Sequence, residues 1–201
     1  MNENGKPWDA RLACQLVYPF RHSGLTPNHL TTLRLMFGIA SCLAFSLGSY
    51  SWTITGAFLF CISNFLDHTD GELARLTGNT SRSGHYYDLI SDALVNILLF
   101  VGIGIGLTQT YLGFYAIPMG SLAGIAIAAI FHLRHEIEQR IGKAEARQPN
   151  IGVMEAEDIL YLLPIVSLAK LLIPFLILAS FGAPLFALWV LREYRILKSD
   201  N

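Results

Sequence analysis

The sequence predicts an all-α protein that crosses a membrane several times. Its 201 residues are 53% hydrophobic and only 14% charged, which is an apolar excess for a water-soluble domain. No Asp, Glu, Lys or Arg occurs between Leu35 and Leu66, or between Ala93 and Leu133. Each run exceeds the ~20 apolar residues that cross a hydrocarbon core as a helix. A helix satisfies its backbone hydrogen bonds internally, so helices are favoured over open sheets in lipid.

Polar breaks divide the apolar regions into six expected transmembrane helices. The first run breaks at Gly48–Ser51, the second near Thr108–Leu112, and a third apolar region, Ile159–Leu191, breaks at Ala169–Lys170. The first helix begins at Thr26-Pro27, an N-cap residue followed by the residue preferred at the first helical position. The six expected helices are residues 29–48, 52–75, 84–107, 112–135, 156–169 and 172–192.

An amphipathic helix at the membrane surface is expected to precede these spans. Within residues 8–20, the apolar side chains of Trp8, Leu12, Leu16 and Phe20 recur at every fourth position. A short disordered lead-in is the alternative interpretation. We therefore expect three parts: an N-terminal interfacial helix (1–24), a six-helix domain (25–195) and a C-terminal tail (196–201).

The basic residues are concentrated on one side of the expected bundle. With six spans, thirteen of the fourteen Lys and Arg residues fall on the same face, and only Lys170 lies on the other. The positive-inside rule makes that face cytoplasmic. We expect an integral multi-pass protein of a bacterial inner membrane, with its functional site and both termini facing the cytoplasm.

Four aspartates stand at fixed spacing near the ends of the second and third expected spans. The residues concerned are Asp67, Asp70, Gly71 and Ala74 on one helix, and Gly84, Asp88 and Asp92 on the next. On each helix they recur at intervals of three or four positions and therefore share a face. The short polar turn from Leu76 to Ser83 makes the two helices antiparallel neighbours, so their carboxylates can converge.

This set of carboxylates predicts a divalent-cation site. Ionised carboxylates in an apolar medium are costly unless cations neutralise them. All-oxygen ligands favour hard ions such as Mg²⁺ or Mn²⁺, and two such ions would balance the charge of four aspartates. Two-metal sites typically serve phosphoryl transfer.

The same stretch resembles the signature of a known family. Asp67-x2-Asp70-Gly71-x2-Ala74-Arg75-x8-Gly84-x3-Asp88-x3-Asp92 is similar, without departure at any position, to the signature of the CDP-alcohol phosphotransferases, also called CDP-alcohol phosphatidyltransferases. The run Pro27-Asn28-His29-Leu30-Thr31-Thr32-Leu33-Arg34 resembles the start of that family's first span. The resemblance implies an integral membrane transferase and a homodimer.

The resemblance also implies roles for individual residues. Asp67, Asp70 and Asp88 would be metal ligands, and Asp92 would be both a further ligand and the catalytic base for the acceptor hydroxyl. A CDP-binding site would be formed by Gly71, Ala74, Arg75 and Gly84, with Asn28 and Arg34 as additional candidates on the nucleotide side. The permanent cation of Arg75 suits a phosphate oxygen.

The end of the fourth expected span carries three candidate residues for acceptor binding. His132, Arg134 and His135 can bind a phosphate of the acceptor, or they can simply anchor the helix at the interface. Their basic character favours a phosphorylated polyol as the acceptor.

The function expected from the resemblance is a metal-dependent transfer in phospholipid biosynthesis. A phosphatidyl group would pass from CDP-diacylglycerol to the hydroxyl of a polyol or polyol phosphate, with release of CMP. In one alternative the nucleotide is carried by the headgroup and not by the lipid, so that a soluble CDP-alcohol donates its phospho-headgroup to a lipid or an inositol phosphate. A non-enzymatic alternative is a divalent-cation carrier, which is disfavoured because the carboxylates cluster at one face and not at the midplane. No nucleic-acid partner is expected.

Overall fold

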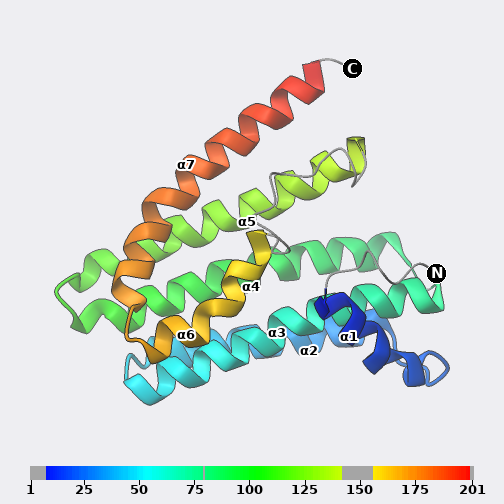
Figure 1. Cartoon of the computed structure of the whole chain (residues 1–201), viewed down its shortest axis with the longest axis horizontal. Helices are drawn as coiled ribbons and strands as arrows, with labels where there is room; N and C mark the ends of the chain where they lie inside the picture. The colour runs from blue at the N-terminus through cyan, green and yellow to red at the C-terminus, as the bar shows by residue number, and fades with distance from the viewer. Residues whose placement is uncertain (1–7, 79, 142–155, 200–201) are drawn as a thin grey trace.

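The computed structural model describes residues 8–78, 80–141 and 156–199, and helices joined by short turns make up these ranges (Figure 1). The prediction of an all-α protein is therefore confirmed. Short 3-10 helices, such as Tyr18–Phe20 and Ala156–Leu162, flank several α-helices. The α-helices of the described ranges are α1 (Trp8–Val17), α2 (Pro27–Ser46), α3 (Tyr50–Thr77), α4 (Arg82–Gly106), α5 (Ala116–Ile141), α6 (Leu163–Leu168) and α7 (Leu172–Ser199).

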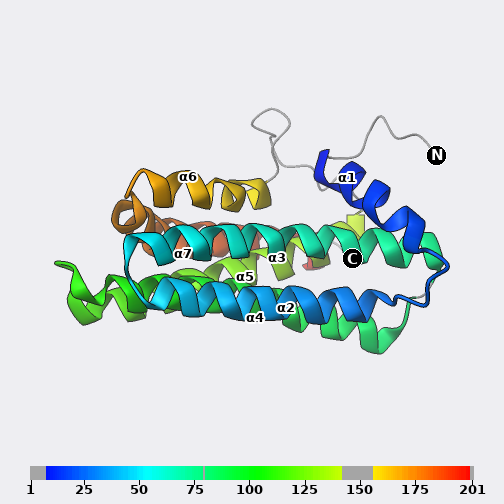
Figure 2. The same ribbon diagram turned by 90° about the horizontal axis from the view of Figure 1, so that it is seen from below.

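The long helices α2 to α5 run alongside one another, and α1 and α6 lie against α3 (Figure 2). Helix α2 packs along both α3 and α4, α4 also packs along α5, and α5 packs along α7. The N-terminal ends of α2 and α4 and the C-terminal end of α3 lie at the same end of the bundle (Figure 1). Because α2 contacts both helices that carry the aspartates, its side chains can enter the space between them.

The prediction of six transmembrane helices is wrong in number. Within the described residues, four helical segments are long and apolar enough to cross a membrane: Pro27–Ser46, Arg82–Gln109, Gly113–Glu138 and Leu172–Lys198. Helix α3, expected as the span 52–75, is long enough at 28 residues. It is too polar, however, because side chains such as Ser63, Asn64 and Asp67 lower its mean hydropathy.

The segment expected as the span 156–169 fails for a different reason. It begins with the 3-10 helix Ala156–Leu162 and continues as α6, which has only six residues. Its apolar helical part, Ile159–Leu168, falls short of the ~20 residues that cross a hydrocarbon core.

The expected N-terminal helix is present as α1, which packs against α3. Ala13 and Val17 are buried, whereas Leu12 and Leu16 of the predicted apolar stripe are exposed. An interfacial position for α1 stays a prediction, as do the boundaries of the three expected parts. Residues 1–7, 79, 142–155, 200 and 201 of those parts lie outside the described residues.

Local signals set the ends of the helices that carry the site. Helix α2 starts at Pro27 after the N-cap Thr26, as the sequence predicts, and the Thr26 N–H donates to Nδ1 of His29. Gly78, with φ of 66°, ends α3 in the left-handed conformation that suits glycine. Ser81 caps α4 by accepting a hydrogen bond of 3.0 Å from the Gly84 N–H to its Oγ.

Glycines set the close approach of α4 to its neighbours. A Cβ at Gly102 of α4 would lie 2.6 Å from the backbone oxygen of Cys42 on α2. A Cβ at Gly120 of α5 would lie 2.2 Å from the backbone oxygen of Phe100 on α4. Since no side chain fits at these distances, the helices meet backbone to backbone, as small residues allow in membrane helix pairs. The contact between Gly102 and Cys42 holds α4 against α2 in the half of α4 that follows the aspartates.

Candidate active site

Three aspartates from two helices come together at one end of the bundle. One carboxylate oxygen each from Asp67 and Asp70 of α3 and from Asp88 of α4 lie within 4.8 Å of one another. The donor set consists of carboxylate oxygens only, which suits a hard divalent cation such as Mg²⁺ or Mn²⁺. These residues therefore fit the metal that the sequence predicts. Asp92, the fourth predicted ligand, lies one helical turn beyond Asp88 on α4 and contacts Arg34.

The Arg34 side chain of α2 enters the carboxylate cluster. Its Nη1 lies 2.6 Å from Oδ1 of Asp67 and 3.4 Å from Oδ1 of Asp88, and its Nη2 donates to Oδ1 of Asp92. The residue is 1% exposed, so its guanidinium is buried, whereas its three carboxylate partners are partly exposed. The family resemblance implies a position for Arg34 on the nucleotide side, whereas the structure places its charged group among the aspartates.

Asp70 has a separate partner that the sequence analysis missed. Thr31 Oγ1 donates a 2.7 Å hydrogen bond to Oδ2 of Asp70, and both residues are buried. A signal for Thr31 was present in the sequence. Together with Asn28 and Arg34 it recurs at every third position of α2, which places it near the face that turns toward α3 and α4.

A hollow of about 170 Å³ lies next to the carboxylates. Most of the residues predicted to bind CDP line it, namely Asn28, Gly71, Ala74 and Gly84. Its wall also includes Asp70 and Asp88, together with the hydroxyl side chains of Thr31, Thr80 and Ser81. The hollow therefore joins the candidate metal ligands to a surface of small residues and hydrogen-bonding groups.

The two signature glycines have different surroundings. A Cβ at Gly71 would meet nothing within 4 Å, so this residue leaves open space in the wall of the hollow. A Cβ at Gly84 would lie 2.9 Å from Oγ of Ser81 and 3.0 Å from Oδ1 of Asn28. Gly84 thus permits the close approach of α4 to α2, while Gly71 leaves room for a ligand.

Arg75 differs from the other predicted CDP-binding residues. It is not among the described residues that line the hollow, and its side chain is 62% exposed. Its Nη1 pairs with Oε1 of the buried Glu72, one turn earlier on α3. Contact between Arg75 and a nucleotide would require this exposed side chain to turn toward the hollow.

The three predicted acceptor-binding residues lie near the C-terminal end of α5 and face different neighbours. The His135 ring lies 5.5 Å from the ring of His85, which lines the hollow. Arg134 pairs with Glu193 of α7 at 3.6 Å, and its guanidinium lies near the ring of Trp189. His132 is exposed. His135 is therefore close to the hollow, whereas Arg134 ties α5 to α7.

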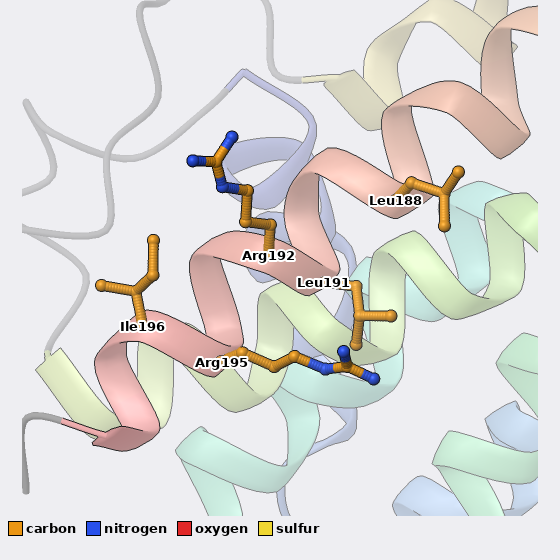
Figure 3. Close-up of a pocket in the computed structure, with 5 residues that line it drawn as sticks. All are labelled: Leu188, Leu191, Arg192, Arg195 and Ile196. Atoms are coloured by element: carbon orange, nitrogen blue, oxygen red, sulfur yellow. The ribbon is translucent and has the colours of Figure 1, made fainter.

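A second hollow, of about 380 Å³, lies along the C-terminal part of α7 (Figure 3). Its lining combines aliphatic side chains, among them Leu188 and Leu191, with Arg192 and Arg195. In the sequence these two arginines indicate topology only, as members of the basic set on one face of the expected bundle. Figure 3 shows their guanidinium groups extending away from each other, so they do not converge on one point of this hollow.

The fold is similar to that of a protein of known structure. The structure resembles that of Mycobacterium tuberculosis phosphatidylinositol phosphate synthase, which was solved with CDP-DAG bound. The TM-score is 0.61 at 20% sequence identity, and the match covers 94% of this chain and 92% of the other. At this identity the likeness shows the fold alone.

Two curated relatives share parts of the sequence. The chain is 30% identical over 118 residues to archaetidylinositol phosphate synthase of Pyrococcus horikoshii, a match that covers 53% of this chain and 61% of the relative. It is 28% identical over 95 residues to the bifunctional IPC transferase and DIPP synthase of Aquifex aeolicus, which covers 47% of this chain and 21% of the relative. The chain thus spans less than two thirds of the length of these relatives.

The sequence pattern that describes the CDP-alcohol phosphatidyltransferases matches residues 24–192, which include α2 to α7 almost completely. The match contains every aspartate of the cluster and confirms the resemblance that their spacing indicates. The chain is an integral, multi-pass membrane protein, and it belongs to the CDP-alcohol phosphatidyltransferase family.

Proposed function

We propose that the protein transfers a phosphatidyl group from CDP-diacylglycerol to a hydroxyl of a phosphorylated polyol, with release of CMP. The observation that carries this proposal is the position of the carboxylate cluster. Asp70 and Asp88 form part of the wall of a hollow that is also lined by Gly71, Ala74 and Gly84. A nucleotide in this hollow would have its diphosphate beside the candidate cation ligands.

The hollow offers groups that suit the polar part of such a donor. Thr80 and Ser81 supply hydroxyls and Asn28 supplies an amide, which can form hydrogen bonds with a ribose or a base. The open space at Gly71 lets a phosphate approach the backbone of α3. Exposed apolar side chains on the bundle, such as Leu33 and Met36 of α2, can contact the acyl chains within the lipid.

The residues of the cluster have different roles in the proposed reaction. Mg²⁺ or Mn²⁺ bound by Asp67, Asp70 and Asp88, with Asp92 as a further ligand for a second ion, would neutralise charge on the diphosphate. The acceptor oxygen attacks the phosphorus distal to the cytidine, the new P–O bond forms, and the bond to the CMP oxygen breaks. Asp92 accepts the proton of the attacking hydroxyl, which a carboxylate within hydrogen-bond reach can do.

An inositol phosphate is the acceptor that the relatives favour. Two similar proteins are named archaetidylinositol phosphate synthase and phosphatidylinositol phosphate synthase, and both names contain an inositol phosphate. In this chain, His135 lies beside His85 at the edge of the hollow, where the pair can contact the phosphate of such an acceptor. We further propose a homodimer, and an orientation with the site and both termini on the cytoplasmic side.

The proposal is tested with purified protein in lipid vesicles that contain CDP-diacylglycerol, with Mg²⁺ or Mn²⁺ and inositol phosphate. We expect CMP release together with transfer of a label from the phosphatidyl part of the donor into a new phospholipid. Asp67→Asn and Asp92→Asn should abolish both. Glu136→Gln, which removes a carboxylate of α5 outside the cluster, should leave them unchanged.

Several outcomes would contradict the proposal. A label that passes to lipid only from the headgroup of a soluble CDP-alcohol would favour the reversed reaction. Divalent-cation flux across the vesicle membrane without CMP release would favour a carrier. Normal turnover of Asp67→Asn would remove the cluster from the mechanism.

A further inference from the structure

Arg34 supplies a positive charge to the acidic cluster from a helix that carries none of the aspartates. Its partners are Asp67 of α3 and Asp88 and Asp92 of α4. Arg34 is 1% exposed, and a buried guanidinium is stable only where opposite charges and hydrogen-bond acceptors surround it. The aspartates in turn gain a permanent cation that no change of pH within the physiological range removes.

The carboxylates that bind Arg34 overlap with those that fit a divalent cation. Asp67 and Asp88 belong to both sets, whereas Asp70 belongs only to the cation set and bonds to Thr31. A lone pair that accepts an N–H from Arg34 is not available to a metal ion. A guanidinium and a divalent cation on the same carboxylates also repel each other.

One donor of the Arg34 guanidinium is not used. The Nε atom is buried and has no acceptor among the described residues. Buried donors are normally paired, and an exception calls for a physical reason. Because Nε makes no hydrogen bond, the guanidinium can rotate toward a different acceptor without losing a hydrogen bond at Nε. The arrangement is thus compatible with displacement of the two Nη groups from the aspartates.

We propose that Arg34 is a built-in competitor of the divalent cation. The guanidinium pairs with Asp67, Asp88 and Asp92 and offsets part of their negative charge when no divalent cation is bound, and its presence lowers the affinity of the cluster for that cation. Arg34 is a positioning residue in this scheme, because it acts through the aspartates. The inference rests on the proposed function in one respect, namely that a divalent cation binds these carboxylates.

The test measures cation binding and stability without any substrate. Arg34→Gln and Arg34→Lys are compared with the parent protein by Mn²⁺ binding, followed by electron paramagnetic resonance, and by thermal unfolding in EDTA. We expect Arg34→Gln to bind Mn²⁺ about tenfold more tightly, because a neighbouring like charge is removed. In EDTA, Arg34→Gln should unfold at a lower temperature than the parent. Mn²⁺ should raise the Tm of Arg34→Gln by more than it raises the Tm of the parent.

The controls separate this role from general effects. Arg82→Gln makes the same charge change at an exposed position of α4 and should bind Mn²⁺ as the parent does. Asp67→Asn should weaken Mn²⁺ binding in both the parent and the Arg34→Gln background; if it weakens neither, the bound ion lies outside the cluster and the inference fails. If Arg34→Gln does not fold, Arg34→Lys serves in its place: it keeps the charge but lacks the fork that engages three carboxylates at once, so it frees carboxylate lone pairs for the ion and should bind Mn²⁺ more tightly than the parent.

The inference is overturned if every folded Arg34 variant binds Mn²⁺ with the parent's affinity or more weakly. It is also overturned if Arg34→Gln is as stable as the parent in EDTA. Failure of the proposed function is seen separately, because the parent protein would then bind Mn²⁺ at the aspartates without releasing CMP from CDP-diacylglycerol.

Discussion

Thr31→Val isolates one contact that holds a candidate metal ligand. Thr31 Oγ1 donates to Oδ2 of Asp70 over 2.7 Å, in a buried environment. Valine has nearly the same shape as threonine but carries a methyl group in place of the hydroxyl. The substitution therefore removes one hydrogen-bond donor from the carboxylate while it leaves the packing of α2 against α3 intact.

The expected size of the effect follows from two independent estimates. A hydrogen bond to a charged group contributes about 1.5–3 kcal/mol. At about 1.4 kcal/mol per factor of ten, this sets an upper limit of roughly 10- to 150-fold on the change in a binding constant, since only the difference between the metal-free and the metal-bound protein affects binding. Loss of an outer hydrogen-bond partner of a metal ligand typically lowers metal affinity by ~10–100-fold. We therefore expect the Mg²⁺ affinity of Thr31→Val to fall by one to two orders of magnitude.

The assay is the Mg²⁺ dependence of CMP release. For Thr31→Val we expect the half-saturating Mg²⁺ concentration to rise by ~10–100-fold, with most of the rate recovered at saturating Mg²⁺. Thr32→Val is the matched control, since Thr32 is the next residue of α2 and its exposed hydroxyl lies 3.0 Å from the Tyr87 Oη. Equal Mg²⁺ dependence of Thr31→Val and the parent, or equal shifts in both variants, would refute the reasoning.

Further predictions follow from the glycines and from the metal. Gly71→Ala should fold like the parent but raise the KM for CDP-diacylglycerol by ~10-fold or more, because its Cβ meets only the open space of the hollow; an unchanged KM would contradict a donor at this wall. Gly84→Ala should instead lower the Tm, since its Cβ would lie 2.9 Å from Ser81 Oγ, and a Tm equal to that of Gly71→Ala would count against this packing. Gly120→Ala should destabilise the protein by about 1–3 kcal/mol or more through its clash with the Phe100 backbone, whereas Gly182→Ala, which meets nothing within 4 Å, should not; thermal unfolding in detergent compares the two. Removal of divalent cations with EDTA should abolish CMP release and excess Mg²⁺ should restore it, so activity that persists in EDTA would contradict a metal-dependent reaction.

The parts of the site that depend on spacing within one helix could be predicted from the sequence. Asp67 and Asp70 share a face of α3, and Asp88 and Asp92 share a face of α4, because positions three or four apart lie on the same side of any α-helix. The start of α2 at Pro27 is equally local, since a cap and a first-turn proline act within one turn.

The position of the Arg34 side chain could not be predicted in the same way. Asn28 and Arg34 stand in one run of residues, and the family resemblance implies a place on the nucleotide side for both. They are six residues apart, which is about 9 Å along a helix at ~1.5 Å per residue. In the structure Asn28 lines the hollow, whereas Arg34 reaches the aspartates. That position depends on α2 packing against both α3 and α4, which involves residues far apart in the sequence, such as Gly102 and Cys42.

The number of spans was overestimated because an absence of charge was treated as sufficient for a membrane helix. No charged residue of α3 precedes Asp67, yet hydroxyl side chains and the amide of Asn64 lower the hydropathy of that part of the helix. The segment before Lys170 is apolar but short, and Lys170 itself, with φ of 58°, stands in the turn between α6 and α7. Hydropathy averaged over a full span, together with helix length, distinguishes these segments from α4, α5 and α7.

The central claim is that aspartates from α3 and α4 bind divalent cations next to a CDP-linked donor. Anomalous scattering from crystals grown with Mn²⁺ and CDP-diacylglycerol tests it most directly. The account predicts Mn²⁺ bonded to carboxylate oxygens of Asp67, Asp70 and Asp88, with the donor's diphosphate on the same ion and its nucleotide in the hollow beside Gly71. Mn²⁺ bound elsewhere, or a nucleotide seated away from these carboxylates, would contradict it.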